Sequence, residues 1–376
     1  MNIDYILSYI TEILIAIFAI VVLFQIFYYL LLFIRFSHHK PKIIAPHSLP
    51  PVSIVMVAKN DAYLLLKTLP EIFTQEYPQF EVVIVNDNSS DETPQLVLDF
   101  QNRFPNLKLV HLDSSVTNIK GKKFPLSLGI KSASYEHILV TDTDCVPASN
   151  QWLKLMMRHF SDTTQIVLGY CKLKKNRGIL NALIRFDRLH QAIQYFSYCI
   201  AKIPFMGMGQ NLAYTKALFF KHKGFASQNH LQFGDDDLFV HRAATTRNCA
   251  MEYSKEAHTI SRFGSNFHHW FLLKIFRSKT RRFYRRPNSF LLNFYHFLIT
   301  FSYITLAFAL YFSSNNLFYV VIVLGILLLK LLTQYIIFGF AAAKLDEKRL
   351  VPHILFFDII FAMMNPVIYF IAKIKK

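Results

Sequence analysis

Two carboxylates separated by one residue are the feature of this sequence best suited to chemistry. Asp142 and Asp144 follow the apolar run 138–140, which we predict to be a buried strand. Carboxylates placed together are expensive to bury unless a cation compensates their charge. Oxygen ligands suit Mg²⁺ or Mn²⁺, and such ions usually complete their shells with substrate phosphates and water. The pair therefore predicts a cation site for a diphosphate, although capped or solvated turns show the same spacing.

Acidic turns follow two further predicted strands. The β-branched runs 52–58 and 81–85 have strand character, and 63–73 between them has helical spacing, which indicates a β-α-β unit and a parallel sheet. In open α/β sheets the carboxyl ends of the strands form the ligand crevice. We therefore predict an α/β domain whose crevice gathers the aspartates that follow the strands, namely Asp61, Asp87, Asp142 and Asp144.

The composition indicates a membrane protein with a basic cytoplasmic face. Of 376 residues, 53% are hydrophobic and only 17% are charged, yet the net charge is +17. The apolar runs 13–34, 289–312 and 317–340 are each long enough to cross a hydrocarbon core of about 30 Å. Lys and Arg follow the first run, precede the second and follow the third, and the positive-inside bias puts these three flanks in the cytoplasm. A nucleic-acid binder would not need such runs, so we exclude nucleic acid as a partner.

Three parts of the chain follow from these runs. We predict an N-terminal transmembrane anchor at 1–40, a cytoplasmic domain at 41–288 and a C-terminal transmembrane region at 289–376. The segment 352–372 allows two interpretations. A full crossing would put the lysines that follow this segment on the outer side of the membrane, against the positive-inside bias. Asp358 and Pro366 instead fit an interfacial or re-entrant segment.

Five stretches in fixed order carry a resemblance to a known family: PVSIVMVAKND, VVIVNDNSSDET, GKKFPLSLGIKSASYEHILVTDTDC, GMGQNLAYTK and FGDDDLFV. Over roughly residues 50 to 285 the chain resembles a membrane-bound glycosyltransferase of family 2, with the Rossmann-like mixed sheet of the GT-A fold. The resemblance implies that Asp144, with Asp142, binds Mg²⁺ or Mn²⁺. It also implies a nucleotide-binding surface made by Ala58, Asn60, Asp61, Asp87, Gly121, Lys122 and Asp142.

Two further motifs take roles from the same resemblance. Gly209, Gln210 and Asn211 resemble the loop that faces the acceptor, where small residues let a sugar or lipid head approach the backbone. Asp235, Asp236 and Asp237 resemble the acidic motif that contains the catalytic base. Adjacent carboxylates repel, which raises the pKa of one of them and suits it to accept a proton. We place the base at Asp236, with Asp235 next, because the motif leaves the register ambiguous.

The sequence departs from the family pattern after Trp270. Members that make polysaccharide processively commonly carry Gln-x-x-Arg-Trp, and no clean match is present, so processivity is in doubt. Arg277 and Arg282 are the nearest basic residues. They are candidate diphosphate ligands, and the alternative is contact with anionic lipid headgroups.

The resemblance implies an inverting, metal-dependent transfer of a sugar from a nucleotide-diphosphate donor to a lipid-linked or glycan acceptor. Two alternatives stay open: transfer to a polyprenyl phosphate, and a catalytically silent membrane scaffold. We expect a multi-pass protein of the inner (plasma) membrane with its catalytic domain in the cytoplasm and membrane lipids as partners. The sequence identifies neither the donor sugar nor the oligomeric state.

Overall fold

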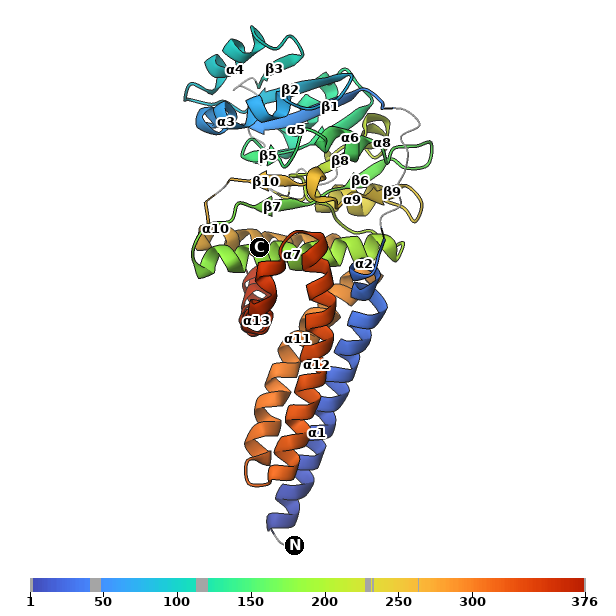
Figure 1. The fold of residues 1–376 in the computed structure, drawn as a ribbon, viewed down its shortest axis with the longest axis vertical. Coiled ribbons are helices and arrows are strands. Elements are labelled where there is room, and N and C mark those ends of the chain that lie inside the picture. The colour runs from blue at the N-terminus through green and yellow to red at the C-terminus, as the bar shows by residue number, and fades with distance from the viewer. Residues whose placement is uncertain are drawn as a thin grey trace. The chain divides into compact units, whose positions relative to one another are not determined.

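The computed structural model describes residues 3–40, 49–112, 121–226, 231, 233–262 and 264–374. They form two compact units, which are coloured along the chain in Figure 1. The sheet unit comprises Lys40–Trp270, and the helical unit combines Met1–His39 with Phe271–Lys376. The acidic motifs therefore lie in one unit and the predicted apolar spans in the other.

A mixed sheet of seven strands is the frame of the sheet unit (Figure 1). In the order β3-β2-β1-β4-β8-β6-β9, the first four strands are parallel, β8 is antiparallel to both neighbours, and β9 is parallel to β6. The α/β fold with a mixed sheet is thereby confirmed. The strands are β1 (Val52–Ala58), β2 (Phe80–Asn86), β3 (Leu107–His111), β4 (His137–Val140), β6 (Ile166–Leu168), β8 (Leu212–Thr215) and β9 (Cys249–Met251).

A second, smaller sheet and a set of helices complete this unit. The order of the small sheet is β5-β10-β7, with β5 at Cys145–Pro147, β7 at Cys171–Leu173 and β10 at Thr259–Ser261. The helices are α3 (Ala62–Phe73), α4 (Thr93–Gln101), α5 (Lys123–Ser132), α6 (Trp152–Met157), α7 (Ile179–Ile200), α8 (Lys216–Lys221), α9 (Asp237–Ala243) and the 3₁₀ turn η4 (Lys255–Ala257). Helix α10 (Phe267–Thr280) begins in this unit and continues into the helical unit.

Helices cover both faces of the large sheet, which explains why its central strands are apolar throughout. On one face, Ile54 of β1 and Leu65 of α3 belong to the main hydrophobic core. On the other face α5 comes so close that a Cβ atom on Gly129 would lie 2.6 Å from Val55 and 2.7 Å from Val85. Packing on both sides fixes β1, β2 and β4, and the turns at their carboxyl ends are held in place with them.

Among its described residues, the helical unit has four helical segments that are long and apolar enough to cross a membrane: Leu7–Ser37, Arg286–Ser313, Leu317–Lys344 and Lys348–Ile374. The predicted runs 13–34, 289–312 and 317–340 each lie inside one of them. The helices are α1 (Ile3–Tyr28), the π-helix η1 (Tyr29–Phe33), α2 (Ile34–Ser37), η5 (Arg281–Phe283), α11 (Arg286–Ser313), α12 (Leu317–Lys344), η6 (Lys348–His353) and α13 (Ile354–Ile374). Figure 1 shows α1, α11 and α12 side by side.

Both ends of α13 lie at the same end of the α11–α12 hairpin. Helix α13 starts shortly after α12 ends, and the carbonyl of Ala372 near its other end accepts a 2.7 Å hydrogen bond from Arg282, just before α11 begins. Ile368 and Ala372 also pack against Ile275 of α10. The segment 352–372 lies within Lys348–Ile374, which is long and apolar enough to cross a membrane, so both interpretations of this segment stay open.

A buried ion pair links α12 to α13. Lys330 Nζ lies 3.4 Å from Asp358 Oδ2, and their side chains are only 1% and 4% exposed. Lys330 also donates to Ser302 Oγ at 3.1 Å, and the hydroxyl of Tyr303 donates to Asp358 Oδ2 at 2.9 Å. Both charges therefore have partners, which is the condition for ionisable groups among apolar helices.

Candidate active site

The turns that follow β1 and β2 interlock to make one wall of the site. The backbone N–H of Asp87 donates to the carbonyl of Ala58 at 2.8 Å, and Lys59 Nζ lies 3.4 Å from the Asp87 carboxylate. Asn60 has a φ of +57°, a left-handed conformation that Asn tolerates, and its side-chain oxygen accepts from the N–H of Ser90 at 2.8 Å. The predicted nucleotide residues Ala58, Asn60 and Asp87 are thus brought together.

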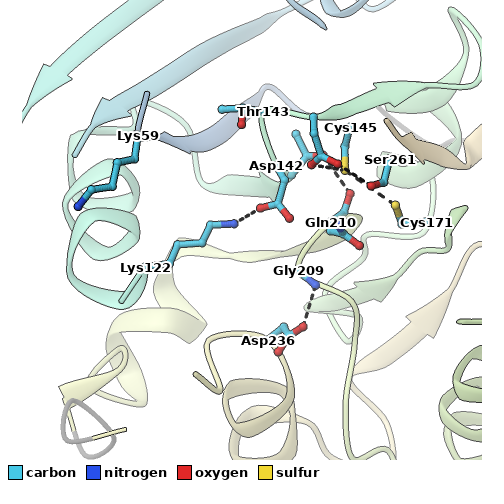
Figure 2. Close-up of polar contacts among 12 residues, drawn as sticks. Lys59, Lys122, Asp142, Thr143, Cys145, Cys171, Gly209, Gln210, Asp236 and Ser261 are labelled. Carbon is cyan, nitrogen blue, oxygen red and sulfur yellow. Dashed lines mark hydrogen bonds and ion pairs between the residues drawn. The ribbon is translucent and has the colours of Figure 1, made fainter. Parts of the chain in front are cut away.

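The Asp142 and Asp144 pair stands at the end of β4, as predicted. Asp142 forms an ion pair with Lys122, which is drawn in Figure 2. Asp144 is 7% exposed, and its Oδ2 accepts a 2.5 Å hydrogen bond from Ser261 Oγ. One ligand atom each from Asp142, Asp144 and Cys145 lie within 4.8 Å of one another. The two carboxylates, from Asp142 and Asp144, offer the negative charge and the oxygen ligands that a divalent cation prefers.

Asp61 joins this acidic group from the end of β1. Its Oδ2 accepts a 2.8 Å hydrogen bond from Thr143 Oγ1, the residue between the paired aspartates. Burial raises the pKa of Asp61, the hydrogen bonds from Thr143 and Lys59 oppose the rise, and the nearby charges of Asp144 and Asp142 add to it. Three of the four predicted strand-end carboxylates, Asp61, Asp142 and Asp144, therefore lie close enough to interact electrostatically.

The acidic run at the start of α9 lies beside the glycine loop. Gly209 N–H donates to Asp236 Oδ2 at 3.2 Å (Figure 2), and Asp237 N–H donates to Asp236 Oδ1 at 2.7 Å. Both oxygens of Asp236 are therefore held by the backbone. Burial raises the pKa of Asp235 to about 6, repulsion from Asp236 adds to this, and Lys122 opposes it.

Lys122 connects the two acidic groups. Burial alone would lower the pKa of its ammonium, but the carboxylates of Asp142 and Asp235 outweigh burial, and the pKa stands above its usual value. Gly121 before it has a φ of +100°, a conformation that favours glycine. Figure 2 shows the Lys122 side chain reaching from α5 toward Asp142. The positive charge of Lys122 therefore interacts both with Asp142 of the carboxylate pair and with Asp235 of the acidic run.

The backbone between Gly209 and Asn211 is fixed from both sheets. The carbonyl of Gln210 accepts 2.9 Å hydrogen bonds from Thr141 Oγ1, beside β4, and from Thr259 Oγ1 of β10. A Cβ atom on Gly209 would lie 3.3 Å from Asp236 Cβ, so the loop and the acidic run are close-packed. The predicted acceptor loop thus lies against the predicted base motif.

The side chain of Asn211 is fully buried: Oδ1 accepts from the indole N–H of Trp152 at 3.0 Å, and Nδ2 donates to the carbonyls of Tyr170 and Ala257 at 3.0 and 2.9 Å. These bonds occupy its polar atoms. The Asn211 side chain therefore braces the loop, and the place of Asn211 in an acceptor-facing loop stays a prediction.

Two other predicted residues belong to the other structural unit. Arg277 of α10 and Arg282 of η5 belong to the helical unit, whereas the aspartates belong to the sheet unit. Conversely, sequence reasoning missed Ser261, which holds Asp144 from a position 117 residues later in the chain. No local motif marks Ser261, because only the pairing of β10 with β5 brings it to the site.

Comparisons with known proteins show which family the sequence resembles. The family model described as glycosyl transferase family 2 matches residues 53–205. A poly-β-1,6-N-acetyl-D-glucosamine synthase from Staphylococcus epidermidis is 35% identical over 95 residues, which are 25% of this chain and 22% of the relative. A β-monoglucosyldiacylglycerol synthase from Trichormus variabilis is 32% identical over 134 residues, or 34% of this chain and 28% of the relative. This chain thus spans about a quarter of the length of these relatives.

A solved structure shares the fold across nearly the whole chain. It is a mannosyltransferase from Pyrobaculum calidifontis in complex with GDP-Man and Mn²⁺, with a TM-score of 0.56 and 19% identity. The match covers 91% of this chain and 98% of the mannosyltransferase. The likeness confirms the predicted GT-A fold.

Proposed function

The model of glycosyl transferase family 2 matches residues 53–205, and on this premise we propose that the chain transfers a sugar from a nucleotide-diphosphate donor to a membrane-associated acceptor. One observation carries the proposal. The carboxylates at the ends of β1 and β4 converge, and Lys122 lies within reach of both this group and the acidic run at α9. A diphosphate binding cleft and a proton acceptor are the two parts that such a transfer needs.

The donor is proposed to lie along the carboxyl edge of the large sheet. The interlocked turns that carry Asn60 and Asp87 would receive the nucleoside, as the family resemblance implies. Asp142 and Asp144 would hold Mg²⁺ or Mn²⁺, which supplies positive charge to the leaving diphosphate. Lys122 adds a positive charge at this edge, and its ion pair with Asp142 keeps that charge in place before a donor binds.

We assign the proton acceptor to Asp235 and a positioning role to Asp236. The sequence-based order was the reverse. Asp236 accepts two backbone N–H bonds, which fix its carboxylate, and its charge helps to raise the pKa of Asp235 to about 6. A base with a pKa near the working pH accepts a proton efficiently and is still mostly ionised.

The proposed reaction is a direct displacement. Asp235 takes the proton from an acceptor hydroxyl, the hydroxyl oxygen bonds to the anomeric carbon, and the bond from that carbon to the diphosphate oxygen breaks. The attack comes from the face opposite the leaving group, so the product has inverted configuration, as in inverting hydrolysis. The acceptor is a lipid or a glycan at the membrane, which the apolar helices and the two curated relatives support.

The location proposed for this reaction is the inner face of the plasma membrane. Basic residues that precede α11 and follow α12 support a cytoplasmic position for that end of the hairpin. A cytoplasmic site would meet the nucleotide sugars of the cell directly.

Transfer from radiolabelled nucleotide sugars tests the proposal. The purified chain in nanodiscs receives UDP-Glc, UDP-GlcNAc or GDP-Man with Mn²⁺ and a membrane lipid extract, and the product is partitioned between water and organic solvent. We expect one donor to label a lipid or glycan, and Asp235→Asn to abolish the labelling while Asp162→Asn, an exposed acid, keeps it. Label in polyprenyl phosphate would identify that acceptor instead. Absence of transfer from every donor would favour a silent scaffold.

A further inference from the structure

The start of α11 carries a groove that the proposed reaction does not use. It has a volume of about 540 Å³ and is lined by η5, the turn after it and one face of α11. Arg282 and Arg286 line one end of the groove, and Phe290, Phe294 and Phe297 line the other. We propose that this groove binds an anionic membrane lipid, with its phosphate between the two arginines and an acyl chain along the phenylalanines.

The length of the groove matches one leaflet of a bilayer. Arg286 and Phe297 lie on the same helix, and at a rise of 1.5 Å per residue they are about 16 Å apart along its axis. The hydrocarbon core is about 30 Å thick, so one leaflet is roughly 15 Å. An amphiphile with its charge at Arg286 would therefore reach Phe297 with a chain that spans its own leaflet.

The aromatic end offers an open apolar surface. Phe290 is 65% exposed and Phe297 is 53% exposed, and the rings of Phe290 and Phe294 stack with centroids 5.7 Å apart. Stacking orders the two rings into one wall. A nucleotide sugar has no apolar part of this length, so the pairing of arginines with a phenylalanine wall favours a lipid over the donor diphosphate.

The polar end is organised to hold an anion. Arg282 donates one N–H to the carbonyl of Ala372 at 2.7 Å, which fixes its guanidinium, and a guanidinium has five N–H donors. Asn293 accepts from Arg281 at 3.4 Å and donates to Ser289 at 3.3 Å, which orders the polar rim. None of the described lining residues is acidic. Charge-assisted bonds to phosphate are the strong class of hydrogen bond, and arginine forms them in pairs.

Lipid retention and thermal stability test this site without any sugar transfer. The chain is purified in detergent, loaded with phosphatidylglycerol or phosphatidylcholine, and analysed by native mass spectrometry and by unfolding temperature. We expect one retained phosphatidylglycerol and a higher unfolding temperature than with phosphatidylcholine. Arg282→Gln/Arg286→Gln should weaken phosphatidylglycerol binding roughly tenfold or more, because it removes charge-assisted hydrogen bonds.

Matched variants separate the groove from general surface charge. Lys348→Gln/Arg349→Gln removes the same charge from exposed residues of η6 and should leave binding unchanged. Arg286→Gln alone replaces one exposed side chain, so its phosphatidylglycerol binding can be measured if the double variant does not fold. Phe290→Gln/Phe297→Gln should also weaken lipid binding.

Three results would overturn the proposal. The first is equal binding of the two lipids by the wild-type chain. The second is equal loss in the groove variant and the η6 variant, which would indicate a general charge effect. The third is full stabilisation by inorganic phosphate alone, because an anion site without a lipid would then suffice.

Discussion

Replacing Asp235 by asparagine should stabilise the protein while it abolishes transfer. Burial and Asp236 raise the pKa of Asp235 from 3.8 to about 6, so the folded chain holds this proton more tightly than the unfolded chain. The ionised carboxylate therefore destabilises the fold as the pH rises from about 4 through 6. A difference of about 2 in pKa corresponds to about 3 kcal/mol, fully present above pH 6 and absent well below pH 4.

Asparagine is neutral at every pH and removes this penalty. At pH 8 we expect Asp235→Asn to be more stable than the wild type by up to about 3 kcal/mol, and at pH 5 by about half as much. For a unit of this size the gain at pH 8 corresponds to roughly 6–12 °C in the unfolding temperature. Both tryptophans of the chain, Trp152 and Trp270, lie in the sheet unit, so tryptophan fluorescence during heating follows this unit selectively.

Asp162→Asn is the matched control, because Asp162 is an exposed carboxylate of the same unit. It should change the unfolding temperature little at either pH. The reasoning is refuted if Asp235→Asn is no more stable than the wild type at pH 8, or if its advantage is the same at pH 5 and pH 8. Retained sugar transfer by Asp235→Asn would separately remove Asp235 from the role of proton acceptor.

Three further substitutions test other parts of the structure. Asp144→Ala should abolish sugar transfer without loss of the chain from the membrane fraction, and unchanged transfer would exclude Asp144 from the site. Asn211→Ala leaves the indole N–H of Trp152 and two buried carbonyls without their partner. We therefore expect thermal unfolding to show a stability loss of about 2–3 kcal/mol. An unchanged stability would contradict the bracing role of Asn211. Lys330→Met leaves Asp358 buried without its counter-charge and should lower the stability of the fold by about 3–5 kcal/mol. Lys330→Met/Asp358→Leu should recover much of this stability. An equal loss of stability in both variants would show that the ion pair does not matter.

Local sequence patterns were sufficient for the strand ends. The runs at β1, β2 and β4 are continuous and largely apolar, and each is followed within three residues by its carboxylate. Chain direction alone therefore puts Asp61, Asp87 and Asp142 at one edge of the sheet. The apolar helices were equally visible, because a predominantly apolar run of 20 or more residues is typical of a membrane span. These features depend only on residues close together in the sequence.

Features that depend on distant segments were not accessible in this way. The burial of Asn211 results from Trp152, Tyr170 and Ala257, which come from separate elements, and no spacing rule distinguishes it from an exposed loop residue. Ser261 reaches Asp144 only because a second small sheet forms. The return of α13 toward Arg282 likewise depends on packing against α10 and not on its hydropathy.

Metal-dependent binding of a nucleoside diphosphate tests the central claim most directly. The unfolding temperature of the sheet unit is measured with UDP and with GDP, each with and without Mn²⁺, for the wild type and for Asp144→Ala. A ligand that binds the native state raises its apparent stability. We predict that one nucleotide stabilises the wild type only when Mn²⁺ is present and leaves Asp144→Ala unchanged. If neither nucleotide stabilises the wild type, or if Asp144→Ala responds equally, the strand-end carboxylates do not form a donor site.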